Sequence, residues 1–309
     1  MLMLKAAALA VASLAGVQVM SAGVDADKAP VAEAAYVKEI EGWRAARIER
    51  LKAPDGWTSL VGLHWLEDGT QSVGSGKDND VVLAVGPARL GTLTLKRGKA
   101  RIELDPAAGA TIDGKATRSA QLRDDARGKP TTVAFGSANF HLIERGGRFA
   151  LRVKDSEAPT RKQFAGIQSY PIDPSWRVQA KWTPSKARRT LDVPNVLGKV
   201  EKMTVPGEAT FTRDGKTYTL LPVLETADAK ELFFIFADRT SAKDTYGAGR
   251  FLYAKMPAGD GVVVIDFNKA YNPPCAFTPH ATCPLAPPEN RLDLAVTAGE
   301  KRYAGAAGH

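Results

Sequence analysis

The chain has 309 residues, of which 44% are hydrophobic and 25% are charged, and this is the composition of an ordinary folded protein. It argues against a disordered chain, and the length allows two globular domains. The formal net charge is +8, but the charged residues are dispersed and not gathered in blocks, so no nucleic acid is expected as a partner.

The first predicted element is a signal peptide. One Lys precedes an apolar stretch from Ala6 to about Met20, and small residues follow it. This pattern predicts a secretory signal over residues 1–23, cleaved near Ala22 or Gly23. An uncleaved anchor is the alternative, although a membrane helix needs about 20 apolar residues. We therefore expect a periplasmic or secreted protein whose mature chain has no transmembrane segment.

Residues 24–54 are predicted to contain a linker followed by a helix. From about Glu33 to Leu51, apolar side chains recur at three- and four-residue steps among charged ones, which is typical of an amphipathic helix. Pro54 and Gly56 are expected to end it, because both residues disfavour helical backbone.

Residues 55–154 are predicted to form a β-sandwich, because short apolar runs alternate with turn residues. The expected strands are SLVGLHWL, DVVLAV, GTLTLKRG, ARIELD, ATIDG, TTVAFG, NFHLIERGG and RFALRVK. The turns at residues 74–80 and 111–114 resemble the framework of a forkhead-associated domain, a class that recognises phosphothreonine. Residues 85–92 lack the Ser and the His of that recognition site, so phosphopeptide binding is not expected.

Residues 155–309 are predicted to form a second β-rich domain, either a sandwich or barrel-like. Its first part, residues 155–185, is rich in proline and resembles a linker. The strand candidates beyond it are KVEKMTVP, GEATFTRDG, KTYTLLPVLE, ELFFIFADRT, RFLYAKMP, GVVVIDFN and RLDLAVTAGEKRY. The runs LFFIF and VVVI are apolar enough to be buried on both faces. The predicted fold class is therefore mainly β, with two β-rich domains and one N-terminal helix.

Four segments of the second domain carry a family resemblance: TYGAGRFL, DFNKAYNPPCAF, CPLAPPEN and AGEK. Together they resemble an uncharacterised bacterial family, domain of unknown function number sixteen eighty-four, from the helix near Tyr36 to the C-terminus. The resemblance implies no particular reaction, substrate or cofactor. It does draw attention to the residues that match its motifs, which are Tyr246, Gly247, Gly249, Arg250, Asp266, Asn268, Tyr271, Asn272, Pro273, Pro274, Cys275, Phe277, Cys283, Pro284 and Asn290.

Several of these residues are predicted to meet at one end of a sheet. Asp266 and Asn268 alternate with apolar residues at the end of a strand, so their side chains should leave on the same face. Arg250 begins a neighbouring strand candidate, and Asp238 ends another. The ligand-binding candidates are Arg250, Asp266, Asn268, Tyr271, Asn272, Asp238 and Tyr246. The alternative is that Arg250 and Asp266 form a buried pair that holds the proline-rich loop, while the two Asn side chains make turns.

Cys275 and Cys283 are the only two cysteines of the chain. In an oxidising compartment they predict a local disulfide. With His280 they could instead hold a metal ion, but no fourth ligand stands out. A nucleophile formed by Cys275 and His280 is a further alternative, against which the expected export argues. We predict no metal and no cofactor.

The predicted function is that of an exported protein that binds a small molecule or a cell-envelope glycan through its second domain. One alternative is a hydrolase at the same place that uses two of Asp238, Asp244 and Asp266, one as acid and one to activate water. A purely structural envelope protein is the other. No nucleophile elbow, phosphate-binding loop or HExxH motif occurs, so the sequence names neither ligand nor reaction.

Overall fold

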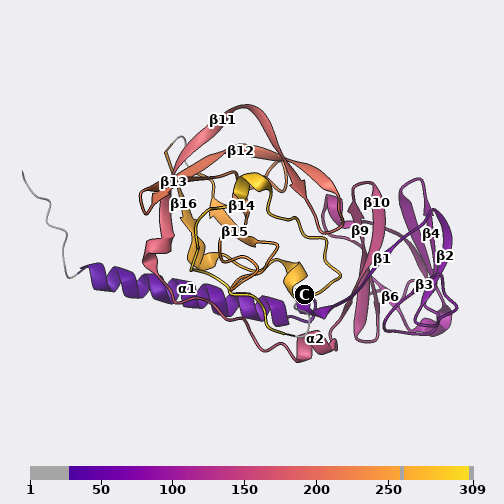
Figure 1. The fold of residues 1–309 in the computed structure, drawn as a ribbon. Helices are drawn as coiled ribbons and strands as arrows, with labels where there is room; N and C mark the ends of the chain where they lie inside the picture. The colour runs from indigo at the N-terminus through magenta and orange to yellow at the C-terminus, as the bar shows by residue number, and fades with distance from the viewer. Residues whose placement is uncertain (1–27, 258–260, 306–309) are drawn as a thin grey trace, which may run out of the picture.

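The computed structural model describes residues 28–257 and 261–305, and Figure 1 shows their arrangement. One long helix runs beside a C-terminal β domain, and an N-terminal β domain lies beyond the end of this helix. The described chain is mainly β, with several sheets, which confirms the predicted fold class. The predicted signal peptide lies outside the described residues. Within them, no helix is both long enough and apolar enough to cross a membrane.

Helix α1 (Lys28–Lys52) includes the predicted helix and begins before its expected start at Glu33. Its buried side chains are spaced by four and seven residues and belong to Tyr36, Ile40, Arg47 and Leu51. This spacing puts them on one face of the helix. The amphipathic pattern therefore identified the face that packs against the rest of the protein.

The N-terminal domain is built from two five-stranded sheets. The first has, in spatial order, β1 (Leu60–Trp65), β10 (Arg148–Asp155), β9 (Ala138–Arg145), β8 (Thr132–Phe135) and β6 (Thr111–Ile112). The second has β3 (Val81–Val82), β2 (Gly69–Gly74), β4 (Gly91–Lys96), β5 (Lys99–Leu104) and β7 (Ser119–Leu122). Side chains of both sheets form one continuous core, which is the arrangement of a sandwich. The forkhead-associated resemblance of this domain stays a prediction.

The C-terminal domain has a four-stranded sheet and a separate two-stranded one. The larger sheet has, in order, β13 (Lys216–Leu220), β12 (Val200–Arg213), β11 (Arg177–Pro194) and β16 (Gly261–Asp266). The smaller sheet pairs β14 (Glu231–Phe236) with β15 (Arg250–Lys255). The long strands β11 and β12 arch over this domain (Figure 1). Two separate cores lie on the two sides of β14, which confirms that LFFIF is buried on both faces.

Two parts of the strand prediction differ from the structure in this domain. The expected linker-like passage ends early, because β11 already begins at Arg177 and pairs with β12 from Lys181. The last expected strand, RLDLAVTAGEKRY, is not part of any sheet and makes only isolated bridges, at Arg291 and Glu300. Its apolar side chains at positions 292, 294 and 296 are nevertheless buried, and those between them are exposed. The alternating pattern therefore indicated which side chains are buried, but it did not indicate sheet pairing.

Short helical turns connect many of these strands. They are α2 (Pro159–Lys162) and the 3-10 turns Trp57–Ser59, Pro106–Ala108, Asp125–Arg127, Pro174–Trp176, Phe267–Lys269, Pro274–Ala276 and Pro288–Asn290. Five of them begin with proline, whose fixed φ suits the first position of a helix and whose missing N–H costs nothing there. The proline-rich loops are thus a series of defined turns.

Partly buried His141 on β9 should make the protein less stable in acid. Burial lowers the pKa of His141 from 6.5 to about 4, and the cations Lys154 and Arg152 add to this effect. Between these two pH values the unfolded chain binds a proton that the folded chain does not, so stability should fall as the pH drops from 6.5 to 4. We expect a loss of roughly 2 kcal/mol, discounted for partial exposure.

Urea denaturation at pH 7 and at pH 4.5 would measure this effect. His141→Gln, which cannot take up the proton, should lose less stability over that interval than the native protein. Equal losses in the two proteins would contradict the assignment of the acid sensitivity to His141.

Candidate functional site

A cavity of about 1340 Å³ lies where helix α1, the C-terminal sheets and the N-terminal sandwich meet. Its lining includes Trp43 and Arg47 of α1, Arg152 of β10, Met203 of β12 and Tyr253 of β15. The volume exceeds the range of about 300–1,000 Å³ that is usual for small-molecule sites. The cavity therefore has room for a ligand of more than one ring.

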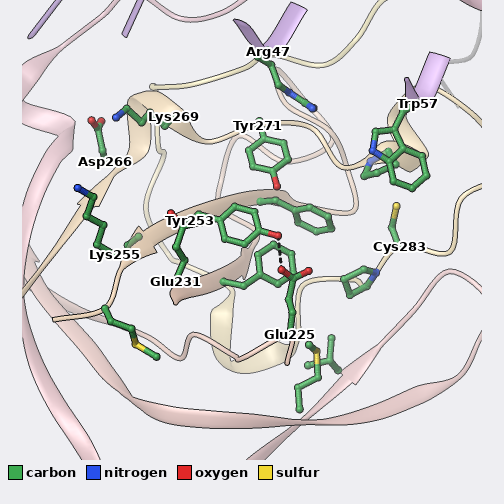
Figure 2. Close-up of a pocket in the computed structure, with 18 of the residues that line it drawn as sticks. Arg47, Trp57, Glu225, Glu231, Tyr253, Lys255, Asp266, Lys269, Tyr271 and Cys283 are labelled. Atoms are coloured by element: carbon green, nitrogen blue, oxygen red, sulfur yellow. Dashed lines mark hydrogen bonds between the residues drawn. The ribbon is translucent and has the colours of Figure 1, made fainter. Parts of the chain in front are cut away.

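The cavity floor consists of aromatic rings, which we call the aromatic floor and define as Phe233, Phe251, Tyr253 and Tyr271. The rings of Phe233 and Tyr253 stack at 4.8 Å and 20°, and those of Tyr253 and Tyr271 at 6.3 Å and 16°. Phe251 packs edge-on against Phe233 at 4.9 Å and against Tyr271 at 5.9 Å. Figure 2 shows the two tyrosines at the centre of the cavity.

Strand pairing explains why these rings meet. Phe233 and Tyr253 are directly opposite in the antiparallel pair of β14 and β15, so their side chains share one face. Phe251 precedes Tyr253 by two residues and lies on the same face. Tyr271 joins through an isolated bridge with Phe251. The other face of β14 packs into the core of the domain.

Polar groups are fixed against the aromatic floor. The Tyr253 hydroxyl donates to Glu225 Oε2 at 2.8 Å (Figure 2). Burial holds the pKa of Tyr253 well above its usual value, and the nearby Tyr271 and Glu225 strengthen this shift. Burial also raises the pKa of Tyr271, against the opposing effect of the Arg47 guanidinium. Both phenols therefore keep their protons at neutral pH. The Tyr253 proton is donated to Glu225, so this hydroxyl offers a ligand its oxygen as an acceptor.

Arg47 ties helix α1 to the floor. Its guanidinium lies 4.5 Å from the centre of the Tyr271 ring. Its Nε is 3.1 Å from Glu300 Oε1, and a terminal nitrogen donates to the Asn272 carbonyl at 2.8 Å. The other oxygen of Glu300 accepts the Asn272 amide at 2.7 Å. Trp43, one turn earlier on the helix, adds a further ring 6.3 Å from Tyr271.

Of the residues predicted to bind a ligand, Tyr271 and Asp266 line the cavity. Asp266 Oδ1 accepts from the Tyr36 hydroxyl at 2.9 Å and from the Asn268 amide at 3.1 Å. Asn268 is fully buried, and its side-chain nitrogen donates to the Tyr36 hydroxyl and to the Asp173 carbonyl. Asn268 therefore joins Tyr36 of helix α1 to the turn before β11, and it is not part of the cavity lining.

Arg250 forms a buried ion pair with Asp238, and not with Asp266 as the alternative interpretation required. The two groups are 2.7 Å apart, and their side chains are 1% and 0% exposed. Arg250 also donates to the carbonyl of Val296 at 2.9 Å and to that of Ala298. The partner differs because Arg250 pairs with Phe236 at the end of β14, and Asp238 follows Phe236 by two residues.

Three more predicted ligand residues also lie outside the cavity lining. Asp238 is engaged by Arg250 and by the Thr240 amide. Asn272 is fully buried and donates to the Lys301 carbonyl at 2.8 Å. Tyr246 is partly buried among apolar side chains, and burial raises its pKa to about 12. Of the three carboxylates considered for a hydrolase, Asp266 lines the cavity, whereas Asp238 and the exposed Asp244 do not.

The predicted disulfide is not formed in the structure. The sulfur atoms of Cys275 and Cys283 are 2.6 Å apart, whereas a disulfide bond measures about 2.05 Å. Both residues are buried free thiols, and the Cys275 amide donates to Cys283 Sγ at 3.2 Å. Cys283 lines the cavity (Figure 2). In the described part of the chain, no three His, Cys, Asp or Glu side chains form a group that could hold a metal ion.

Sequence reasoning missed most of the cavity residues. Phe251 and Tyr253 had a usable signal, because they alternate along one strand candidate, whereas Phe233 is followed directly by Phe234, which lies on the opposite face. Glu225 and Arg152 had none, because each is a common charged residue whose position depends on how distant segments pack.

Comparison with known proteins identifies a relationship for the C-terminal part of the chain. Residues 162–301 match a family described as "Protein of unknown function (DUF1684)". This segment contains all of β11–β16 and the aromatic floor. The solution NMR structure of an uncharacterized protein from gene locus rrnAC0354 of Haloarcula marismortui is 31% identical, covers 46% of this chain and 78% of that chain, and has a TM-score of 0.39. No curated protein matches the chain.

Proposed function

We propose that this chain, whose residues 162–301 belong to the DUF1684 family of proteins of unknown function, is an exported protein that binds a small molecule or a cell-envelope glycan in the cavity. The aromatic floor is the observation that carries the proposal. Aromatic side chains that line a cavity favour flat or partly apolar ligands, and a hydroxyl fixed among them can orient such a ligand.

The polar groups of the cavity support a ligand that also makes hydrogen bonds. Tyr253 is held by Glu225, so its position is set before a ligand arrives. Exposed Lys255 and Glu231 lie across the same strand pair and offer one donor and one acceptor group. The volume of about 1340 Å³ suits a molecule of several rings, such as an oligosaccharide. Export is supported by the N-terminal sequence pattern alone.

The proposal predicts that cell-envelope oligosaccharides raise the melting temperature of the chain starting at Val24, and that the aromatic floor is required. A ligand at a hundred times its Kd should stabilise the fold by about 2.7 kcal/mol. Tyr253→Ala should weaken binding about tenfold, because a stacked ring contributes roughly 0.5–1.5 kcal/mol and its hydroxyl a similar amount. Tyr253→Phe should lose only the contribution of the hydroxyl to the binding free energy.

Tyr218 provides the matched control. It lies on β13 outside the cavity lining, its ring packs 5.6 Å from Phe211, and its hydroxyl donates to a backbone carbonyl. Tyr218→Phe should bind as the native protein does. The proposal fails if no oligosaccharide of the panel binds, or if folded Tyr253→Ala binds with native affinity.

A further inference from the structure

Arg152 is a buried cation with too few partners. It projects from β10 and lines the cavity where the N-terminal sandwich meets the C-terminal domain. Its side chain is 7% exposed. A terminal nitrogen donates one long hydrogen bond, of 3.3 Å, to Thr282 Oγ1. Its Nε has no hydrogen-bond partner among the described residues.

The nearest carboxylate is already occupied. Asp125 lies 4.0 Å from Arg152, beyond hydrogen-bond distance. Arg145 binds both oxygens of Asp125, at 2.9 and 2.7 Å, and the Glu144 amide adds a further bond. Arg145 therefore neutralises most of the negative charge of Asp125. The positive charge of Arg145 also repels that of Arg152.

A buried guanidinium of this kind is unusual. It carries five N–H donors, and removing it from water is costly unless an anion or several acceptors replace the water. Burial lowers the pKa of Arg152 to about 10, so the group stays charged at neutral pH. Arg47 and Arg250, by comparison, each contact a carboxylate and at least one carbonyl. Arg250 also has an Nε without a partner among the described residues, but it lies outside the cavity lining. Of these three arginines, only Arg152 has no hydrogen bond to a carboxylate.

Neighbouring groups hold the guanidinium in place. Arg152 lies 5.2 Å from the centre of the Trp57 ring, a cation–π contact that fixes its plane. Trp57 and Thr282 line the same cavity as the aromatic floor. Figure 2 shows Trp57 and Cys283 on one side of the two tyrosines, with Lys255, Lys269 and Asp266 on the other side. A ligand lying on the floor could therefore extend one end toward Arg152.

We propose that Arg152 binds an oxyanion, a carboxylate or a phosphate, of the ligand that rests on the aromatic floor. This inference rests on the proposed function and narrows it to anionic ligands with a flat or partly apolar body. A planar guanidinium with free N–H groups matches either anion through paired hydrogen bonds.

Benzoate and its neutral isostere benzamide test the charge requirement, with inorganic phosphate as a probe that has no ring. Titrations at constant ionic strength should show that benzoate binds at least tenfold more tightly than benzamide. Arg152→Gln should remove this preference. Arg148→Gln is the matched control, since Arg148 is an exposed residue of the same strand that lies 4.5 Å over Trp65 and is not part of the cavity lining.

A measurement on the native side chain covers the case in which Arg152→Gln does not fold. The ¹⁵Nε resonance of Arg152, assigned with Arg152→Lys, should shift on adding benzoate or phosphate and not on adding benzamide. If it does not shift with either anion, the inference is wrong. If benzamide and neutral oligosaccharides bind as well as benzoate, only the anion requirement fails. If no probe of either kind binds, the proposed function fails with it.

Discussion

Arg250→Ala is expected to destabilise the protein by about 3–5 kcal/mol, the usual cost of breaking a buried ion pair from one side. The substitution would leave the buried Asp238 carboxylate without its counter-charge, with only Thr240 as a hydrogen-bond donor. It would also remove the donors that hold the carbonyls of Val296 and Ala298. These carbonyls belong to the extended C-terminal segment, which has no sheet ladder of its own and therefore depends on Arg250.

Urea denaturation with Arg239→Ala as control would measure this loss. Arg239 pairs with Asp293 at the surface, where the side chains are 62% and 63% exposed, so its removal should change stability by less than about 0.5 kcal/mol. The double variant Arg250→Met with Asp238→Asn should be more stable than Arg250→Ala, because no unpaired charge remains. A folded Arg250→Ala of native stability that no longer binds ligand would instead support the sequence-based assignment of Arg250 to the binding site.

The fold was predictable where the sequence carries a strong period. Helix α1 and strands β4, β5, β9 and β14 have clear spacing of apolar residues, and the structure contains all of them. Strands β2 and β7 were missed, because GTQSVG and SAQL contain few apolar residues and are defined by their neighbours in the sheet. The first half of β11, residues 177–185, was interpreted as a linker, because it too contains few apolar residues. Its proline and basic residues lie on an exposed stretch where the ladder to β12 is interrupted between Pro184 and Arg189.

The site was harder to predict than the fold. The sequence pointed to polar residues at strand ends, and these form networks that hold the loops, as Arg250 and Asn268 do. The cavity instead depends on which residues are opposite in β14 and β15, and on a helix and a sandwich that approach from distant parts of the chain. Neither pairing register nor domain packing can be derived from local periodicity.

Arg47→Gln is expected to destabilise the protein by about 3–5 kcal/mol at pH 7, with a characteristic pH dependence. The change leaves Glu300 buried with only the Asn272 amide as a close partner. Burial already raises the pKa of Glu300 above 4.5, and Arg47 opposes that rise. Without Arg47 the pKa of Glu300 should therefore rise further.

The sign of the pH effect follows from proton uptake. A carboxyl whose pKa is raised by folding binds a proton in the folded state first, so the folded state gains stability as the pH falls through the raised pKa toward 4.5. The stability gap between Arg47→Gln and the native protein should therefore shrink between pH 7 and pH 5, as measured by urea denaturation. Acid effects common to both proteins, such as that of His141, cancel in this difference.

Adding Glu300→Gln to Arg47→Gln should remove the pH dependence of the gap, since no titrating group is left at this position. Arg50→Gln, an exposed change one turn along the same helix, should show a small gap at every pH. A gap for Arg47→Gln that stays constant from pH 7 to pH 5 would mean that its cost comes from lost packing on Tyr271 and not from the unpaired Glu300. In that case, the aromatic contact, and not the ion pair, would be what fixes helix α1 beside the cavity.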